Sequence, residues 1–204
     1  MRIVAGNLRG RRIIAPAGAR SRPTSARVRE AVFSMVADAV RGAAVLDLFA
    51  GSGALGLEAA SRGAESVVLV ERERGAANVA QRNAEIVAKA GAVRALVEQV
   101  AVHQYLQRSG RQFDLVFVDP PYRLPAHEIS AVLSDLAPLL AHPAMVVVEQ
   151  SKRAEPLSLP GDLEVERSRD YGDTRVHYLT TSGLANDVVP PDAHPDAGQA
   201  DADA

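Results

Sequence analysis

The sequence has no cysteine among its 204 residues, and it has no apolar run approaching the ~18 residues that cross a bilayer. The first absence excludes disulfides and thiolate metal sites. The second excludes a transmembrane helix, and no apolar signal segment follows Met1-Arg2-Ile3. The five histidines are scattered along the chain, so no metal site is expected either. We therefore expect a soluble cytoplasmic protein with no membrane partner.

Lysine is nearly absent: Lys89 and Lys152 are the two lysines among 23 basic residues. Arginine favours forked contacts with phosphate and stacking on bases, although genome composition explains the ratio equally well. Genome composition does not explain why the arginines cluster at the start of the chain. Residues 1–41 hold nine arginines against two acidic residues, whereas residues 185–204 hold five aspartates and no basic residue. A basic end on a chain of net charge −2 indicates a polyanionic partner.

From residue 44 the hydrophobic pattern alternates between strand and helix, which predicts a mostly parallel sheet covered on both faces. The predicted strands are 44–49, 66–71, 93–98, 113–118 and 144–149, with an antiparallel edge hairpin of 163–169 and 175–181. The predicted helices between them are 54–62, 73–90, 101–108 and 126–141.

The chain ends differ from this central pattern. The start predicts a hairpin of 2–6 with 11–15 and then a helix over 26–40. We therefore expect three parts: a basic RNA-binding extension (1–41), an α/β domain (42–183), and a disordered acidic tail (184–204).

The tetrad Asp119-Pro120-Pro121-Tyr122, called the DPPY turn below, directly follows the predicted strand 113–118. Two consecutive prolines end the strand and force a turn. The turn presents a carboxylate, the Pro120 carbonyl and an aromatic ring at the carboxyl end of a central strand, where ligands bind in open α/β sheets. Two acceptors beside a flat ring suit a planar base that carries an NH₂ group.

Three glycines, Gly51, Gly53 and Gly56, follow the first strand of the sheet with the spacing G-x-G-x-x-G, and Glu71 follows the next strand. In this strand–turn–helix context the pattern predicts a cofactor site. The glycines admit a ligand close to the backbone, and the acid accepts ribose hydroxyls. Any adenosine-containing cofactor fits, and a tight turn without a ligand is the alternative.

Asp47, just before this glycine loop, distinguishes between cofactors. A carboxylate there repels the pyrophosphate of NAD, but it can hold the ammonium group of an amino-acid tail. S-adenosylmethionine carries such a tail and no phosphate. The residues therefore favour S-adenosylmethionine.

With both motifs in place, the chain resembles the class I S-adenosylmethionine-dependent methyltransferases and, within them, the RsmD family. The resemblance also includes the start Met1–Gly10, Arg22-Pro23-Thr24, Arg27–Glu30, Asn83 and Tyr171–Thr174. It implies a Rossmann-like fold with a mostly parallel seven-stranded sheet. It also implies a monomer that methylates the N2 amine of one guanine, at position 966 of the 16S rRNA in the small ribosomal subunit.

The resemblance implies roles for individual residues. Asp119 and the Pro120 carbonyl would accept the N–H bonds of the amine, and Tyr122 would stack on the base, which must leave the RNA stack. Glu98 and Gln99 stand where the family often has a polar residue for the adenine amine. The implied cofactor residues are Asp47, Gly51, Gly53, Glu71, Gln99, Arg22 and Thr24. The implied RNA contacts are Arg9, Arg11, Arg12, Arg27, Arg29 and Tyr171.

Three other functions stay open. A DNA adenine-N6 methyltransferase would use the DPPY turn equally well, but the chain lacks a separate domain for reading a duplex. An NAD-dependent oxidoreductase would have no use for Asp47 or the DPPY turn. A non-enzymatic ribosome-assembly factor would use the basic start of the chain and would not need Asp119.

Overall fold

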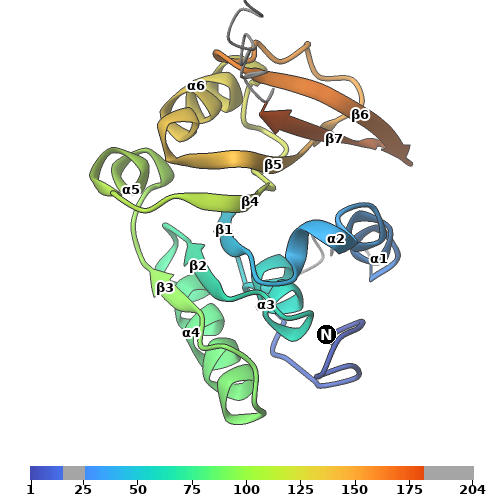
Figure 1. The fold of residues 1–204 in the computed structure, drawn as a ribbon, viewed down its shortest axis with the longest axis vertical. Helices are drawn as coiled ribbons and strands as arrows, with labels where there is room; N and C mark the ends of the chain where they lie inside the picture. Colours follow the sequence, from blue (N-terminus) through green and yellow to red (C-terminus); the bar gives the residue numbers. More distant parts are fainter. Residues whose placement is uncertain (16–25, 182–204) are drawn as a thin grey trace, which may run out of the picture.

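A seven-stranded sheet forms the centre of the computed structural model, which describes residues 1–15 and 26–181 (Figure 1). The strand order is β3-β2-β1-β4-β5-β7-β6, and all neighbours are parallel except β7, which is antiparallel to β5 and β6. The strands are β1 (Ala44–Leu48), β2 (Ser66–Val70), β3 (Leu96–Glu98), β4 (Phe113–Val118), β5 (Leu140–Ser151), β6 (Leu163–Tyr171) and β7 (Thr174–Thr181). The Rossmann-like fold and the antiparallel edge hairpin are thus confirmed. Arg22, Thr24 and the tail from residue 184 lie outside the described residues.

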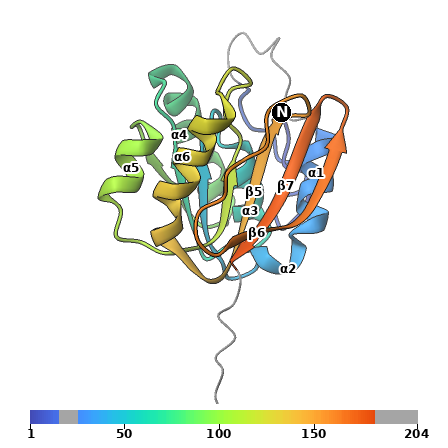
Figure 2. The same cartoon turned by 90° about the horizontal axis from the view of Figure 1, so that it is seen from above.

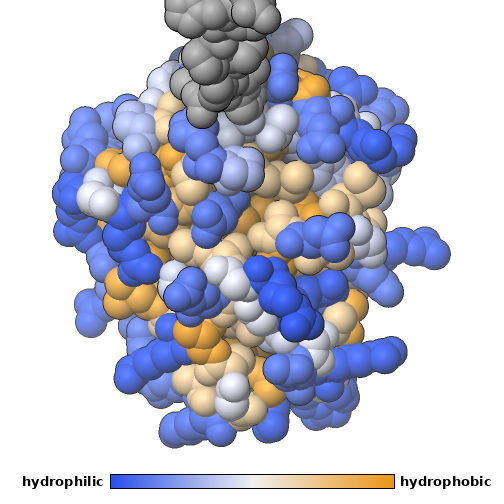
Figure 3. All heavy atoms as spheres, in the orientation of Figure 1, coloured by the Kyte–Doolittle hydropathy of each residue, from blue (hydrophilic) through white to orange (hydrophobic). Residues whose placement is uncertain are grey.

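The helices cover both faces of the sheet because inward-facing strand residues alternate between two apolar clusters. One face carries α1 (Ala26–Met35), α2 (Ala37–Val40), α3 (Ala54–Ser61) and α4 (Arg74–Lys89). The other carries α5 (Val102–Arg108) and α6 (Ala126–Leu136), followed by the 3₁₀ turn η1 (Ala137–Leu139). Figure 2 shows α6 and α1 on opposite sides of the strands. Hydrophilic residues dominate the outline of the face in Figure 3, with apolar atoms mainly in its middle.

Several predicted elements differ from the structure. The helix expected over 126–141 ends at Leu136, because Ala137–Leu139 form η1 and β5 already begins at Leu140. The helix expected over 26–40 is interrupted at Val36, so it forms α1 and α2. The strand expected over 93–98 shortens to β3 at the edge of the sheet, where it has one neighbour. β5 is longer than expected, because β7 pairs with it as far as Ser151. No helix in the described ranges is long and apolar enough to cross a membrane.

The basic start of the chain packs into the main core. The hairpin predicted from 2–6 with 11–15 does not form two strands: residues 1–15 make a tight loop with a single antiparallel bridge, between Arg2 and Arg12. Ile3, Leu8 and Ile13 are each at most 7% exposed and belong to the same cluster as α1, α3 and β1. The hydrophobic core therefore runs across the expected boundary at residue 41.

Buried polar groups of α3 and α4 fasten this loop. The Glu58 carboxylate accepts the Val4 and Ala5 N–H groups at 2.7 and 2.8 Å. The Oδ1 atom of Asn83 accepts a hydrogen bond from the Ile14 N–H at 2.7 Å. Its Nδ2 atom donates to the carbonyls of Ile14 and Ser52. The N-terminal segment is thus tied to the glycine loop through Asn83, whose side chain is fully buried.

Arg29 belongs to the same buried network. It is 3% exposed, its guanidinium lies 3.8 Å from Glu58, and it donates to the Arg2 carbonyl at 2.8 Å. Burial lowers the pKa of Arg29, and the carboxylate of Glu58 opposes that shift. Arg29 therefore has a structural role, contrary to the expectation that it contacts RNA.

Replacement of Glu58 by alanine is expected to lower the free energy of unfolding by about 3 kcal/mol, because two backbone donors lose their acceptor and the buried guanidinium of Arg29 loses its counter-charge. Chemical denaturation of the purified variant measures the change. Glu65→Ala removes an exposed acid and serves as the control, with an expected change within about 0.5 kcal/mol. Equal small effects in both variants would show that Glu58 does not hold the N-terminal segment.

Candidate functional site

A cleft of about 710 Å³ opens at the carboxyl ends of the parallel strands. Glycine-loop, strand-end and DPPY residues form its walls together, although they are far apart in the sequence. Its lining comprises Phe49, Gly51, Glu71, Arg72, Glu73, Ala101, Val102, Asp119, Pro120, Pro121, Tyr122 and Leu124. The structure thus brings together the two motifs that the sequence singles out.

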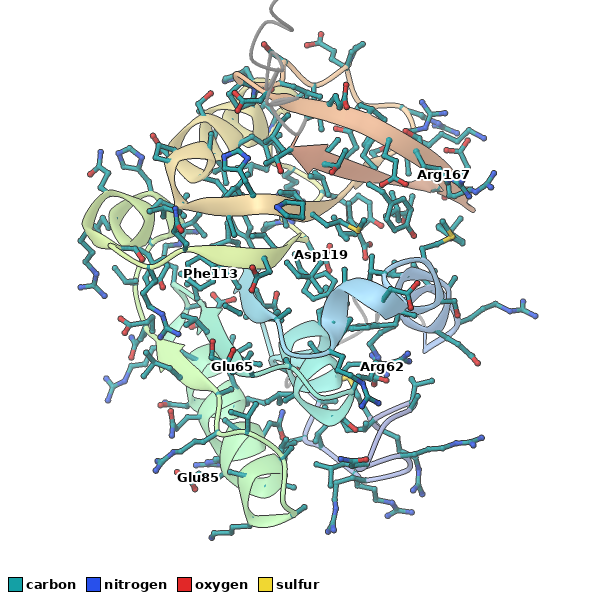
Figure 4. All side chains as sticks on the ribbon, viewed as in Figure 1. Arg62, Glu65, Glu85, Phe113, Asp119 and Arg167 are labelled. Carbon is teal, nitrogen blue, oxygen red and sulfur yellow. The ribbon has the colours of Figure 1, made fainter. Side chains whose placement is uncertain are left out.

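The DPPY turn forms one wall of the cleft. Figure 4 shows Asp119 at the end of β4 opposite to Phe113. The Tyr122 ring is 48% exposed, and its hydroxyl shares a 2.5 Å hydrogen bond with the Thr174 hydroxyl, where β7 begins. An aromatic ring that is fixed at its tip and open on its face can stack on a planar ligand.

The glycine loop and Glu71 form the opposite part of the cleft. Glu71 accepts the N–H groups of Gly51 and Glu73 at 2.9 and 2.7 Å, which fixes its carboxylate on the wall. Gly51 and Gly53 have φ of 56° and 80°, a left-handed conformation that favours glycine. A Cβ on Gly56 would lie 2.3 Å from the Leu69 side chain. Gly51 therefore lines the cleft, whereas Gly53 and Gly56 serve the turn and the packing of α3 on β2.

Asp47 lies beneath the glycine loop and is not part of the cleft lining. It is 1% exposed and accepts the Gly56 N–H at 2.8 Å. Burial raises the pKa of Asp47 to about 8, the Gly56 bond opposes this, and the charges of Asp119 and Glu71 add to it. The carboxylate is close enough to the site to respond to a bound cation.

The structure does not bring Gln99 to the cleft. Gln99 is exposed beyond β3, and Glu98 binds Arg108 at 2.5 Å. Ala101 and Val102, at the start of α5, line that end of the cleft instead. An apolar wall there suits the face of a ring more than its amine edge.

The arginines predicted to contact RNA separate into two groups. Arg9, Arg11 and Arg12 are exposed on the N-terminal loop, and Arg27 is exposed on α1, whereas Arg29 is buried. Tyr171 is half-buried at the end of β6 and packs against the core of the α1 side. Four exposed arginines thus remain for a polyanion.

Two residues to which the sequence analysis assigned no role lie next to the cleft. Thr174 fixes Tyr122, and Glu149, within β5, lies beside Asp119 at a small void. Burial raises the pKa of Glu149 to about 8, and the charges of Asp119 and Asp47 add to the rise. The signal was present in the sequence, because Glu149 follows three consecutive valines much as Asp119 follows Val118. In the described ranges, no group of three or more metal-ligating side chains could hold an ion.

Comparison with known proteins gives consistent matches. A family described as conserved hypothetical protein 95 matches residues 1–180. The ribosomal RNA small subunit methyltransferase D of Escherichia coli (strain K12) is 36% identical over 172 residues, covering 84% of this chain and 85% of that protein. YlbH of Bacillus subtilis (strain 168) is 35% identical over 186 residues, covering 90% and 100%.

Solved structures share the fold. That of yhhF from Escherichia coli has a TM-score of 0.78 at 34% identity, covering 89% of this chain and 97% of that chain. The magnesium protoporphyrin IX methyltransferase ChlM from Synechocystis PCC 6803, solved with bound SAM, has a TM-score of 0.59 at 21% identity, covering 76% and 79%. The second likeness shows the fold alone.

The two buried acids are expected to make stability fall as pH rises. Asp47 and Glu149 both have a pKa raised to about 8, so the folded chain holds more protons than the unfolded chain between about pH 4 and pH 8. The free energy of unfolding should fall by about 1.4 kcal/mol for each unit by which these pKa values are raised, which amounts to several kcal/mol over that window. Denaturation of the ligand-free protein at several pH values measures this.

Glu149→Gln, which is neutral at every pH, should flatten the slope. Comparison of the two proteins cancels the opposite contribution of His177, whose pKa is lowered by burial. Identical slopes would show that Glu149 does not titrate in this window.

Proposed function

Since the chain belongs to the family described as conserved hypothetical protein 95, we propose that it is a methyltransferase of small-subunit ribosomal RNA. Its substrate is the exocyclic N2 amine of one guanine in 16S rRNA, the guanine at position 966, and its methyl donor is S-adenosylmethionine. It acts as a monomer. The observation that carries the proposal is the shared cleft, in which the DPPY turn faces the glycine loop and Glu71.

The cleft fits S-adenosylmethionine in its charges and walls. Glu71 is fixed by two backbone N–H groups and can accept ribose hydroxyls, and Gly51 allows close approach. Asp119 and Glu71 place carboxyl groups on the wall of the cleft, and a bound cation would favour the ionised form of Asp47 beneath it, so the site favours a cationic cofactor over a pyrophosphate. Arg22 and Thr24 stay proposed cofactor residues outside the described ranges, and Gln99 would have to move to reach the adenine.

The DPPY turn fits the acceptor amine. The cofactor would supply an electrophilic methyl group on a sulfonium. Asp119 and the Pro120 carbonyl accept the two N–H bonds of the amine and align its nitrogen with that methyl, while Tyr122 stacks on the base. Methylation would release one proton from the amine, and the Asp119 carboxylate that accepts this N–H bond is placed to receive it.

The N-terminal arginines fit an RNA substrate. Arg9, Arg11, Arg12 and Arg27 are exposed, and phosphate contacts position a nucleic acid without reading its sequence. Tyr171 precedes the turn that ends at Thr174, the partner of Tyr122, so it can contact the same substrate. DNA adenine methylation uses the same two acceptors, but the named relative acts on ribosomal RNA.

Labelled methyl transfer tests the function. The wild-type protein with labelled S-adenosylmethionine should label small ribosomal subunits that lack the modification, and mapping should place the label on N2 of one guanine. Labelling of DNA alone would overturn the proposal. Asp119→Ala should lower the transfer rate about 10²-fold or more.

Asp119→Asn is the matched variant, because it keeps an acceptor oxygen, and it should retain more activity than the alanine variant. Calorimetry should show S-adenosylmethionine bound by both variants. An Asp119→Ala protein with the wild-type rate would contradict the role of Asp119 and favour another acceptor.

Removal of the exposed arginines should weaken RNA binding in a salt-dependent way. The triple variant Arg9→Ala, Arg11→Ala, Arg12→Ala should bind the small-subunit RNA several-fold more weakly. The slope of log affinity against log salt should decrease by about 0.7–0.9 for each lost phosphate contact. Titrations at three salt concentrations measure both quantities. Arg94→Ala, which removes an exposed arginine far along the chain, is the control, and an equal effect there would contradict a localised RNA surface.

A further inference from the structure

Glu149 stands beside Asp119 on the same face of the sheet. Phe117 pairs with Val147 in the β4–β5 ladder, and both belong to the core on the α1 side. Side chains two residues further along point to the same face, and parallel strands lie about 4.8 Å apart. Glu149 also lines, with Asp119 and the rest of the DPPY turn, a small void of about 20 Å³. The two carboxylates are therefore neighbours, with Asp119 on the wall of the cleft and Glu149 behind it, at the void next to the DPPY turn.

The carboxylate of Glu149 lacks the donors that a buried acid normally has. Its side chain is 6% exposed, and within the described part of the chain its Oε1 atom has no hydrogen-bond partner. The groups that face it are Asp119 from β4, Asp47 from β1 and Tyr178 from β7. Burial and the two acids raise the pKa of Glu149 to about 8. An acceptor in such a place is completed by a ligand that brings an N–H donor.

Guanine and adenine differ in the number of donors beside the reactive amine. The N2 amine of guanine has two N–H bonds, and the adjacent ring nitrogen N1 carries a third. The N6 amine of adenine also has two, but its adjacent N1 is an acceptor. The two acceptors of the DPPY turn match the amine of either base, whereas a third acceptor beside Asp119 matches guanine alone.

We propose that Glu149 is this third acceptor and selects guanine. Its Oε1 atom accepts the N1–H of the target base while Asp119 and the Pro120 carbonyl hold the N2 amine. The inference rests on the proposed function and names the residue that gives it its base specificity. Above the Glu149 pKa of about 8 the side chain is an ionised carboxylate with no proton to donate, and an adenine in the same place would direct the lone pair of N1 at a carboxylate oxygen, a repulsion that rejects it.

The test combines two target bases with substitutions of Glu149, so that each protein is measured on each base. Small ribosomal subunits are reconstituted with guanine or with 2-aminopurine at the target position. The analogue keeps the N2 amine but has no hydrogen on N1. The ratio of kcat/KM for the two substrates is measured by labelled methyl transfer for the wild type, Glu149→Gln and Glu149→Met. Glu65→Gln, which neutralises an exposed acid, is the control.

We expect the wild type and Glu65→Gln, assayed above pH 8 where Glu149 is ionised, to prefer guanine by roughly tenfold or more, since the analogue leaves a buried acceptor without its donor. Glu149→Met has no acceptor, and Glu149→Gln can turn its NH₂ group toward the bare nitrogen, so both should bring the ratio close to one. Loss of O6 from the analogue affects all proteins alike and cancels when the ratios are compared.

An unchanged ratio in both Glu149 variants would overturn the inference. A purely structural role, or a role as proton acceptor, slows both substrates by the same factor and leaves the ratio as it is. Glu149→Gln, which keeps the shape of the side chain, decides the matter if Glu149→Met does not fold. A wild-type protein that methylates neither substrate would overturn the proposed function instead.

Discussion

The burial of acids close to one another at the carboxyl end of the sheet is the constraint on which this structure depends. Parallel strands end on the same side, so Asp47, Glu71 and Asp119 lie at the ends of β1, β2 and β4, and Glu149 lies level with Asp119 in β5. Backbone N–H groups stabilise Glu71 and one oxygen of Asp47. The raised pKa values of Asp47 and Glu149 show that this compensation is incomplete. A ligand that brings a cation and N–H donors supplies what the fold lacks.

The N-terminal segment is packed into the same hydrophobic core as the sheet. Glu58 and Asn83 use buried hydrogen bonds to hold residues 4, 5 and 14 against α3 and α4, and Asn83 also binds the glycine loop. These bonds are strong because they are shielded from water. The exposed arginines of the loop are therefore held on the same core as the glycine-loop wall of the cleft. Under the proposed function, in which the arginines bind the substrate and the glycine loop binds the cofactor, removal of the segment would disturb both.

The sequence predicted the elements whose pattern is local. The strand β4 and the DPPY turn follow from an apolar run and two prolines, and the glycine loop follows from its spacing. Burial that depends on residues far away in the sequence could not be predicted from the sequence alone. In the sequence Arg29 cannot be distinguished from the exposed arginines near it. The structure shows that it is buried beside Glu58 of α3. Glu149 ends an apolar run as Asp119 does, but its importance depends on the pairing of β4 with β5, which sequence spacing alone does not show.

The same limit explains why the DPPY turn indicates an amine as the target but does not distinguish guanine from adenine. Two acceptors can match two N–H bonds and no more, and both guanine and adenine offer two on the reactive nitrogen. The atom that distinguishes the bases is the neighbouring ring nitrogen, which donates in guanine and accepts in adenine. A residue that reads it must lie beside Asp119, on a strand that the motif does not include. In this fold the adjacent strand is β5, and the residue at that position is Glu149.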